Sequence, residues 1–477
     1  MSRWPKVAFS DLTLDAQNGF AARTGSGELT VVLRLADIDS DTWAIASEEL
    51  RQIGMSAEQR EKYALAVGDL LVVRVNGSPK IAGRIVAYAG PPGLAYCDHF
   101  IRFRMNARVV PKFIAYQFRH RPIRSQVEAG MVSTAGQHTV SQRTFAGISV
   151  SVAPFSEQLQ IVKAIETQFT RLDEASALLE RAKANLKRAR ASVLKAAVEG
   201  RLVPTEAALA RSEGRDYEHA SVLLTRTLAE GRARGTESGE RSKYREPKAP
   251  QNVSEPAPKP EGWTWATLEQ VSARIVDCLH STPKFVSSGY ACLDTNAMGA
   301  GTFRLEDLRY VDQLTFNERN RRLVPQEGDI VFAREGTVGN AVVLGNLAVC
   351  LGQRTMLIRT SLCYPRLIMH WMMSPFVRKQ YAPLIAGSTV AHLNMADIRR
   401  FILPLPPLAE QHRIVAEVDR RLSVLDAIEQ TINADLARTS RLRQSIVKCA
   451  FEGSLVPSAP RMTGDPQLRI SPQDAAR

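Results

Sequence analysis

The chain has 477 residues, of which 44% are hydrophobic and 23% charged, as in an ordinary globular protein of two to four domains. Lys and Arg total 62 against 49 Asp and Glu, and the net charge of +13 favours a polyanionic partner, nucleic acid first, over a merely basic protein without one. No run of about 18 apolar residues and no signal-peptide core occurs, so we expect no membrane segment and a cytoplasmic location.

Residues 1–152 are predicted to form a first mixed α/β domain. Apolar runs typical of strands lie at 29–35, 69–75, 81–88 and 100–104, and a helical pattern follows at 111–118. Polar loops beside these runs carry side chains that suit base edges, since Arg suits guanine and Asn suits adenine. We expect the following loop residues to contact DNA: Arg23, Thr24, Arg74, Asn76, Ser78, Lys80, Gln137 and His138.

Residues 153–204 are predicted to form one long helix. Apolar residues recur from Ile161 to Ala196 in alternating steps of four and three, which is the heptad seam of a coiled coil. Pro154 precedes the pattern, and Gly200 with Pro204 ends it. About 40 residues at 1.5 Å each give a rod of roughly 60 Å. Residues 205–262 follow as a short helix near 218–232 and a Pro-rich linker.

Residues 263–403 are predicted to form a second mixed α/β domain with the same order of elements. Strand-like runs lie at 330–333, 340–344 and 355–359, before a helical pattern at 365–373. Arg74 falls opposite Arg334, and we expect Trp4 to correspond to Trp265.

Candidate DNA contacts in this second domain lie in polar loops at matching places. They are His280, Thr282, Lys284, Arg334, Glu335, Thr337, Gln353, Arg354, Ser388, Thr389, His392 and Asn394. The basic run 319–322 is expected to hold phosphates without specifying sequence. Gln137 and His138 are interpreted as the first copy's version of the His392 loop. For every candidate, the alternative is a solvated turn or an internal ion pair.

Residues 404–457 are predicted to form a second long helix, and residues 458–477 a frayed tail. Residues 154–204 align with 407–457 without a gap and share 18 identities in 51 positions, so the chain is an internal duplication. Two such helices pair most simply antiparallel, which predicts a pseudo-twofold α+β molecule with an antiparallel coiled coil between its globular domains. Such a rod would fix the distance between two DNA readers; a plain coiled coil without that role is the alternative.

Motifs of catalysis are missing from the sequence. There is no Asn-Pro-Pro-Tyr methyltransferase motif, no GxxxxGK[ST] phosphate loop, no dinucleotide fingerprint and no nuclease-like carboxylate cluster. The six Cys form no CxxC pair and the eight His no HxxxH pair, so we expect reduced thiols, no metal and no catalytic residue. A DNA reader is therefore favoured over a self-contained DNA-modifying enzyme and over a coiled-coil scaffold that does not read sequence.

Four segments resemble the specificity subunit of type I restriction–modification systems. They are the run 328–339, the stretch 403–411 that opens the second long helix, the ending 451–457 and the loop 280–283. The resemblance covers nearly the whole chain in the expected order. The first copy departs mildly, because it has Val-Ala-Pro-Phe-Ser-Glu-Gln at 152–158 where the second has Leu-Pro-Pro-Leu-Ala-Glu-Gln at 405–411.

The resemblance implies a non-catalytic recognition subunit for double-stranded DNA. Each globular domain would read one half of a split, asymmetric site through the major groove, and the helices would set the half-site spacing. Two modification (methyltransferase) subunits would dock on the chain, and restriction–translocase subunits would join. S-adenosylmethionine, ATP and Mg would then be cofactors of those partners, with none held by this chain.

Overall fold

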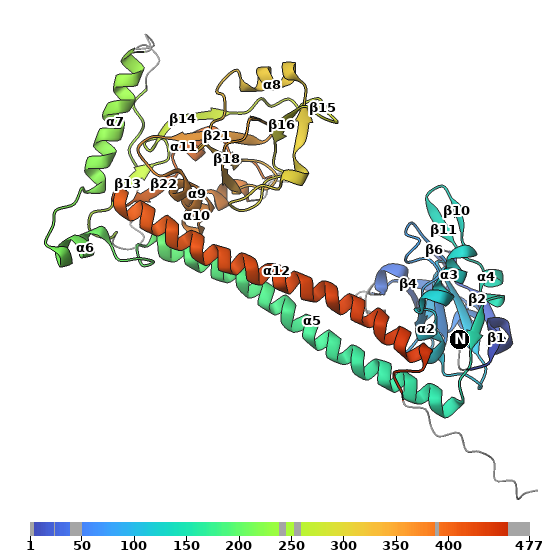
Figure 1. Cartoon of the computed structure of the whole chain (residues 1–477). Helices are drawn as coiled ribbons and strands as arrows, with labels where there is room; N and C mark the ends of the chain where they lie inside the picture. Colours follow the sequence, from blue (N-terminus) through green and yellow to red (C-terminus); the bar gives the residue numbers. More distant parts are fainter. Residues whose placement is uncertain are drawn as a thin grey trace, which may run out of the picture. The chain divides into compact units, whose positions relative to one another are not determined.

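The computed structural model describes residues 4–22, 24–38, 50–237, 245–251, 259–386 and 391–456. The chain divides into two compact units: unit 1 is residues 1–180 with 433–477, and unit 2 is residues 181–432. Each unit contains one globular domain and parts of two long helices, α5 (Phe155–Val198) and α12 (Leu408–Glu452) (Figure 1). Among the helices described, none combines the length and the apolar character that crossing a membrane requires.

Unit 1 begins with a domain of short strands and helices. The strands are β1 (Lys6–Ala8), β2 (Thr13–Asn18), β3 (Glu28–Leu33), β4 (Gln52–Met55), β5 (Leu70–Val73), β6 (Val75–Asn76), β7 (Ile85–Ala87), β8 (Ala95–Tyr96), β9 (Phe100–Met105), β10 (Val132–Thr134), β11 (Gln137–Thr139) and β12 (Ser149–Ser151). The helices are α1 (Ala57–Tyr63), α2 (Pro111–Gln117), α3 (Arg121–Ala129) and α4 (Gln142–Ala146).

The central sheet of unit 1 is antiparallel, with the strand order β2-β9-β5-β7. Leu70, Val72 and Ile101 share a cluster with Phe113 and Ile114 of α2, which explains why the strands are apolar runs. A second sheet, β4-β3-β8, contains the parallel pair β3-β8, and β1 pairs with β12 just before α5.

One predicted strand of this domain is shorter than expected. The run 81–88 is a strand only from Ile85 to Ala87. The chain turns just before it, where Gly83 has φ +73° and donates its N–H to the Val73 carbonyl over 2.7 Å. The apolar residues of the turn are therefore outside the ladder.

Unit 2 repeats this arrangement. Its strands are β13 (Thr264–Thr267), β14 (Ser272–Asp277), β15 (Phe285–Val286), β16 (Tyr290–Leu293), β17 (Arg309–Val311), β18 (Ile330–Ala333), β19 (Ala341–Val343), β20 (Val349–Leu351), β21 (Thr355–Thr360) and β22 (Ile402–Leu405). Its helices are α6 (Glu206–Glu213), α7 (Ala220–Glu237), α8 (Gln313–Asn320), α9 (Pro365–Met373), α10 (Pro375–Ile385) and α11 (Met395–Arg399).

The central sheet of unit 2 matches that of unit 1 strand for strand, whereas the second sheet has four strands, β15-β17-β16-β20, in place of three. The central sheet is β14-β21-β18-β19, the second sheet contains the parallel pair β16-β20, and β13 pairs with β22 just before α12. The ion pair Arg104–Asp69 on β9 and before β5 recurs as Arg359–Asp329 on β21 and before β18. The predicted fold, two mixed α/β domains with paired long helices as an internal repeat, is confirmed.

Each long helix begins at a joint built from the same side chains. In unit 1, Trp4 Nε1 donates to Glu157 Oε2 over 3.0 Å. The neighbouring Gln158 is buried; its amide accepts from the Val110 N–H at 2.7 Å and donates to the Ala153 carbonyl at 2.8 Å. The Glu-Gln pair of the repeated motif therefore fixes the domain to the first turn of α5.

The joint of unit 2 uses the equivalent residues 253 positions later. Trp263 Nε1 donates to Glu410 Oε1 over 3.0 Å, and Gln411 accepts from the Tyr364 N–H at 2.9 Å and donates to the Pro406 carbonyl at 3.0 Å. Both Glu410 and Gln411 are fully buried, and burial raises the pKa of Glu410.

The expected match of Trp4 with Trp265 is wrong. Trp4 corresponds to Trp263, because both indoles bond the glutamate that opens a long helix. Trp265 lies in β13 and stacks on Phe376 at a ring-centroid distance of 5.7 Å. Trp263 and Trp265 are only two positions apart, and their partners, Glu410 and Phe376, lie far away in sequence. The sequence alone therefore did not show which of them corresponds to Trp4.

The long helices pair antiparallel. In unit 1, Asp173 of α5 forms an ion pair with Arg443 of α12. In unit 2, Arg190 of α5 pairs with Asp426 and, at 2.6 Å, with Glu429 of α12. Residue numbers thus rise along α5, from 173 to 190, while those of the α12 partners fall, from 443 to 426. The expected endings hold too, since Gly200 and Gly453 follow the helices with φ of +66° and +82°.

The segment after α5 contains more structure than the predicted short helix and linker. It forms two helices, α6 and α7, and α6 packs on the start of α12. The Glu206 N–H donates to Glu410 Oε2 at 2.9 Å, and the Glu206 carboxylate pairs with Arg215 and Arg413, each at 2.6 Å. The sequence pattern did not predict α6, because its apolar face is short and the helix is held mainly by the buried carboxylate of Glu206.

Trp263→Phe is expected to lower the unfolding free energy of unit 2 by about 1.5–3 kcal/mol, because buried Glu410 loses its indole donor. Trp4→Phe is the matched control; its effect should be smaller, because Glu157 is half-buried and within reach of water. Hydrogen exchange of peptides from the first turns of α5 and α12 measures both changes. Equal losses of protection at the two joints would contradict this account.

Candidate nucleic-acid interface

The predicted contact residues gather at the same end of both central sheets. In unit 1, β2 and β5 finish there and β7 and β9 begin; in unit 2, β14 and β18 finish there and β19 and β21 begin. We call this the loop end of each sheet. Its described segments are 19–22 with residue 24, 74–84, 97–99 and 137–140 in unit 1, and 278–284, 334–340, 352–354 and 391–394 in unit 2.

Equivalent backbone hydrogen bonds hold these segments together in unit 1 and unit 2. Arg74 N–H donates to His99 O at 2.7 Å and Arg74 O accepts from Val140 N–H at 2.9 Å. The matching bonds in unit 2 are Arg334 N–H to Arg354 O at 3.1 Å and Leu393 N–H to Arg334 O at 2.9 Å. The Gln137–His138 loop is therefore the counterpart of the His392 loop, with Thr139 in the place of His392.

In unit 1 the loop end is a small exposed sheet. Asn76 of β6 lies opposite His138 of β11, and Asn76 Oδ1 accepts from the Ser78 N–H at 2.8 Å, which shapes the following loop. The β10–β11 hairpin turns at Ala135 and Gly136 with φ of +47° and +76°, which suits a tight two-residue turn. An amide and an imidazole thus lie on neighbouring strands, β6 and β11.

A hollow of about 690 Å³ lies against this ribbon. Asn76 and Gln137 line it together with Asp98, His99 and Arg51. Amide, imidazole, carboxylate and guanidinium groups all face it, so it offers donors and acceptors of the kinds that discriminate base edges. Two of the predicted contacts, Asn76 and Gln137, are among its lining residues.

Cys97, Asp98 and His99 are the one group among the described residues whose ligand atoms lie close enough to hold a metal. The His99 Nδ1 atom is 3.3 Å from Asp98 Oδ1 and 3.9 Å from Cys97 Sγ. Burial raises the pKa of Cys97, which disfavours the thiolate that metals bind. We assign no metal to this group.

In unit 2 the loop end is organised around a buried arginine. Arg334 is only 2% exposed, and its Nε lies 3.0 Å from Asp277 Oδ1. Its Nη1 donates to the Leu393 carbonyl at 3.2 Å, and its Nη2 lies 3.2 Å from His280 Nδ1. His392 Nε2 is 3.4 Å from Nη1. The guanidinium therefore ties three separate loops together.

Exposed side chains surround this arginine. His392 Nδ1 bonds Glu335 Oε1 at 2.8 Å. Gln353 donates to the His280 carbonyl at 2.9 Å and accepts from Thr282 Oγ1 at 3.0 Å. These contacts bring five of the predicted residues into one hydrogen-bonded cluster with Arg334, and the histidines and Thr282 keep exposed surface.

Arg354 sits at the edge of the cluster in an unusual conformation. Its φ is +74°, a left-handed backbone conformation that residues with a Cβ adopt rarely, and its side chain is exposed. The guanidinium Nε is 4.0 Å from Glu335 Oε2. Strained backbone of this kind collects at binding sites.

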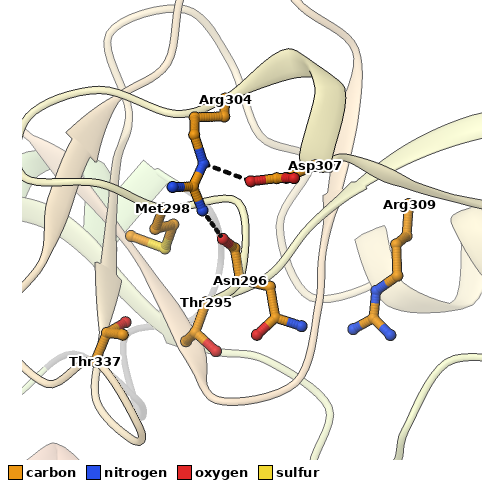
Figure 2. Close-up of a pocket in the computed structure, with 7 residues that line it drawn as sticks. All are labelled: Thr295, Asn296, Met298, Arg304, Asp307, Arg309 and Thr337. Atoms are coloured by element: carbon orange, nitrogen blue, oxygen red, sulfur yellow. Dashed lines mark hydrogen bonds and ion pairs between the residues drawn. The ribbon is translucent and has the colours of Figure 1, made fainter. Parts of the chain in front are cut away.

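A second hollow, of about 650 Å³, opens beside the cluster (Figure 2). Thr337 lines it together with Asn296, Arg304, Asp307 and Arg309. Figure 2 shows Arg304 between Asp307 and the Asn296 carbonyl, to which it donates at 2.8 Å. Two guanidinium groups and an exposed amide make this hollow a suitable surface for phosphate and base edges.

The other predicted contact residues that the structure describes lie outside the unit 2 cluster and do not line either hollow. Thr24, Lys80 and Lys284 are exposed, and Asn394 Nδ2 bonds Asp397 Oδ2 at 3.5 Å at the start of α11. Arg74 donates from Nη1 to the Asp98 carbonyl at 3.4 Å. Arg23, Ser388 and Thr389 lie outside the described residues.

The interpretation of the run 319–322 as a phosphate-binding strip is wrong for its first half. Arg319 is 7% exposed and donates to the Leu351 carbonyl at 2.9 Å and to the Ser281 carbonyl. Asn320 is also buried. Arg319 thus supports the His280 loop from within, since the tertiary fold covers a run that is basic in sequence.

Sequence reasoning missed Asp98 and His99 in unit 1 and Asn296, Arg304 and Arg309 in unit 2. His99 occupies the place of Arg354, immediately before the equivalent strands β9 and β21, so an alignment of those strands contains the signal. No sequence pattern indicated the residues of the second hollow. They come from a loop and a strand of the more divergent second sheet.

Comparisons with known proteins agree with this architecture. The sequence model of the type I restriction modification DNA specificity domain matches residues 300–438. The type I restriction enzyme StySPI specificity subunit of Salmonella potsdam is 31% identical over 247 residues, which are 50% of this chain and 52% of that subunit. Residues 300–438 thus match the DNA specificity domain of type I restriction–modification systems, and the chain is similar to type I specificity subunits.

Two further comparisons extend over more of the chain. The type I restriction enzyme EcoKI specificity subunit of Escherichia coli (strain K12) is 23% identical over 405 residues, 83% of this chain and 76% of that subunit. A solved chain of a type I R-M system covers 94% of this chain and 98% of its own length with a TM-score of 0.61 and 20% identity, which shows a shared fold. The match to the StySPI specificity subunit spans about half of that subunit's length.

Proposed function

We propose that this chain is a type I specificity subunit that reads a bipartite, asymmetric sequence in double-stranded DNA and has no catalytic site of its own. Each globular domain would read one half-site through the major groove with the loop end of its central sheet. The paired helices would set the spacing between half-sites and dock two modification subunits. Restriction–translocase subunits would join the same complex in the cytoplasm.

The observation that carries this proposal is the equivalence of the two loop ends. Equivalent segments, three of them joined in each unit by equivalent backbone hydrogen bonds, present different side chains in the two units. Unit 1 offers Asn76, Gln137 and His138, whereas unit 2 offers a cluster around His280 and His392. Two copies of one platform with different chemistry suit two different half-sites.

The division of labour along the chain follows from this proposal. Residues 1–152 and 263–403 would be the two target-recognition domains, and residues 153–204 and 404–457 the two spacer helices. Residues 205–262 would connect the copies, and 458–477 would be a tail. The net charge of +13 supports a phosphate-rich partner. S-adenosylmethionine, ATP and Mg would be bound by the partner subunits.

A map of methylated adenines in cells expressing this chain with its modification subunits tests the proposal. We expect one split motif that disappears when this chain is deleted, because the chain would supply the only sequence information. The modification subunits expressed alone are the control. An unchanged methylation map, with expression of all subunits verified, would remove the specificity role.

A further inference from the structure

We infer that a basic hollow in unit 1, between the α2–α3 junction and the last turns of α12, binds phosphates of the DNA backbone beside the half-site read by that unit. This inference rests on the proposed function and adds a contact surface to it. The hollow has a volume of about 840 Å³. Its charged lining residues are Arg119, Arg121, Arg124, Arg441, Lys448 and Glu452, with His120 beside them.

Much of the positive charge in this hollow is uncompensated. Arg121 and Arg124 share one carboxylate, Glu128, each at 3.1 Å. The side chains of Arg441 and Lys448 form no hydrogen bond or ion pair with any residue in the described part of the chain, and both residues are exposed. Five cations thus face two carboxylates, and such a surface attracts a polyanion.

The N-terminus of α3 adds to this potential. His120 is the N-cap residue of this nine-residue helix, and its side chain makes no capping hydrogen bond. The positive end of the helix dipole therefore lies at the hollow without a side-chain cap, and it favours an anion there. Arg119, one residue earlier, lies over the Tyr116 ring at 5.4 Å, which supports its guanidinium without neutralising it.

Arg124 connects the hollow to the loop end of unit 1. Its Nη2 donates to the Ala82 carbonyl at 2.7 Å and to the Pro79 carbonyl at 2.5 Å, both in the segment 74–84. The wall of the hollow is thus bonded to the loop that follows Asn76. A duplex held at the loop end would have its backbone next to this wall, which favours DNA over an acidic protein as the occupant.

The second copy lacks half of this surface. The N-cap residues His120 and Ser374 are equivalent, so Met373 and Pro375 occupy the places of Arg119 and Arg121. The helix cations are kept, since Arg188 and Lys195 lie 253 positions before Arg441 and Lys448. Unit 1 would therefore hold the backbone more strongly than unit 2, and the helix cations form a matched pair of test sites.

The test compares two double variants of the full chain, Arg441→Gln/Lys448→Gln and Arg188→Gln/Lys195→Gln. Binding to a duplex with the mapped site and to an unrelated duplex is measured at several salt concentrations. We expect the first variant to lose about 1–2 units of the slope of log K against log salt, at roughly 0.9 per phosphate contact, with an unchanged preference between duplexes. The second variant should lose less.

Two results would overturn the inference. One is an unchanged slope in Arg441→Gln/Lys448→Gln; the other is an equal loss in both double variants, which would mean a general effect of net charge. If folding of a double variant is impaired, the single variants Arg119→Gln and Lys448→Glu replace it. If the unmodified chain shows no salt-dependent binding to either duplex, the proposed function itself fails, which separates the two outcomes.

Discussion

Arg334→Ala is expected to destabilise the loop end of unit 2 by about 3–5 kcal/mol, because it leaves the Asp277 carboxylate with only the His280 imidazole, 3.2 Å away, as a partner. Arg334 is 2% exposed and Asp277 is 18% exposed, so solvent screens this pair weakly. The substitution also removes the donor to the Leu393 carbonyl and the neighbour of both histidines. Reading of one half-site should be lost with it.

Hydrogen exchange of peptides from β18, β21 and the segment 391–394 measures this effect locally, which suits a chain with two units. Protection in unit 1 should be unchanged. Arg74→Ala is the matched control at the equivalent position; its loss should be smaller, because Arg74 is half-buried and makes one long hydrogen bond of 3.4 Å. Equal exchange in Arg334→Ala and the unmodified chain would show that the arginine does not hold the loops.

Replacing residues 4–153 by residues 263–406 is expected to give a chain that recognises two copies of its second half-site. These boundaries run from the tryptophan of each joint to the residue before Pro154 or Pro407, so the Trp–Glu and Gln contacts are kept. Under the proposed function each globular domain carries the specificity for one half-site, so a chain with two copies of the second domain would recognise the second half-site twice. The original first half-site should disappear from the methylation map.

The reciprocal chimera, with residues 4–153 in place of 263–406, is the control for this exchange. It should recognise two copies of the first half-site only. Methylation maps of both chimeras, made with the same modification subunits, give the result directly. If the first chimera still methylates the original asymmetric motif, the globular domains do not carry the sequence information.

Regular patterns made most of the fold predictable. Heptads and the Pro and Gly at their ends located both long helices, and buried apolar runs located the central strands. The strand 81–88 was overestimated because apolar turn residues look like strand residues in sequence. Helix α6 was missed because its position depends on Glu206, a carboxylate stabilised by Arg215 and Arg413 from other segments.

The sequence predicted where the residues of the candidate site lie better than it predicted what each of them does there. Polar residues in loops after apolar runs identified His280, Gln353 and His392, which the fold brings together. Burial of Arg334 and Arg319 was not predictable, because the groups that cover them come from segments far away in sequence. Both arginines act on the loops from inside, so residue type alone did not separate a group that contacts a ligand from one that positions its neighbours.

The left-handed backbone conformation of Arg354, at the edge of the unit 2 cluster, sets stability against recognition at this position. A glycine would adopt φ +74° without the steric cost of a Cβ, of the order of 1–2 kcal/mol. Glycine would also delete an exposed guanidinium beside Glu335. Selection for stability would therefore favour glycine at this position, whereas selection for DNA recognition would favour arginine. Variants screened only for heat resistance would become more stable and would discriminate less well between DNA sequences.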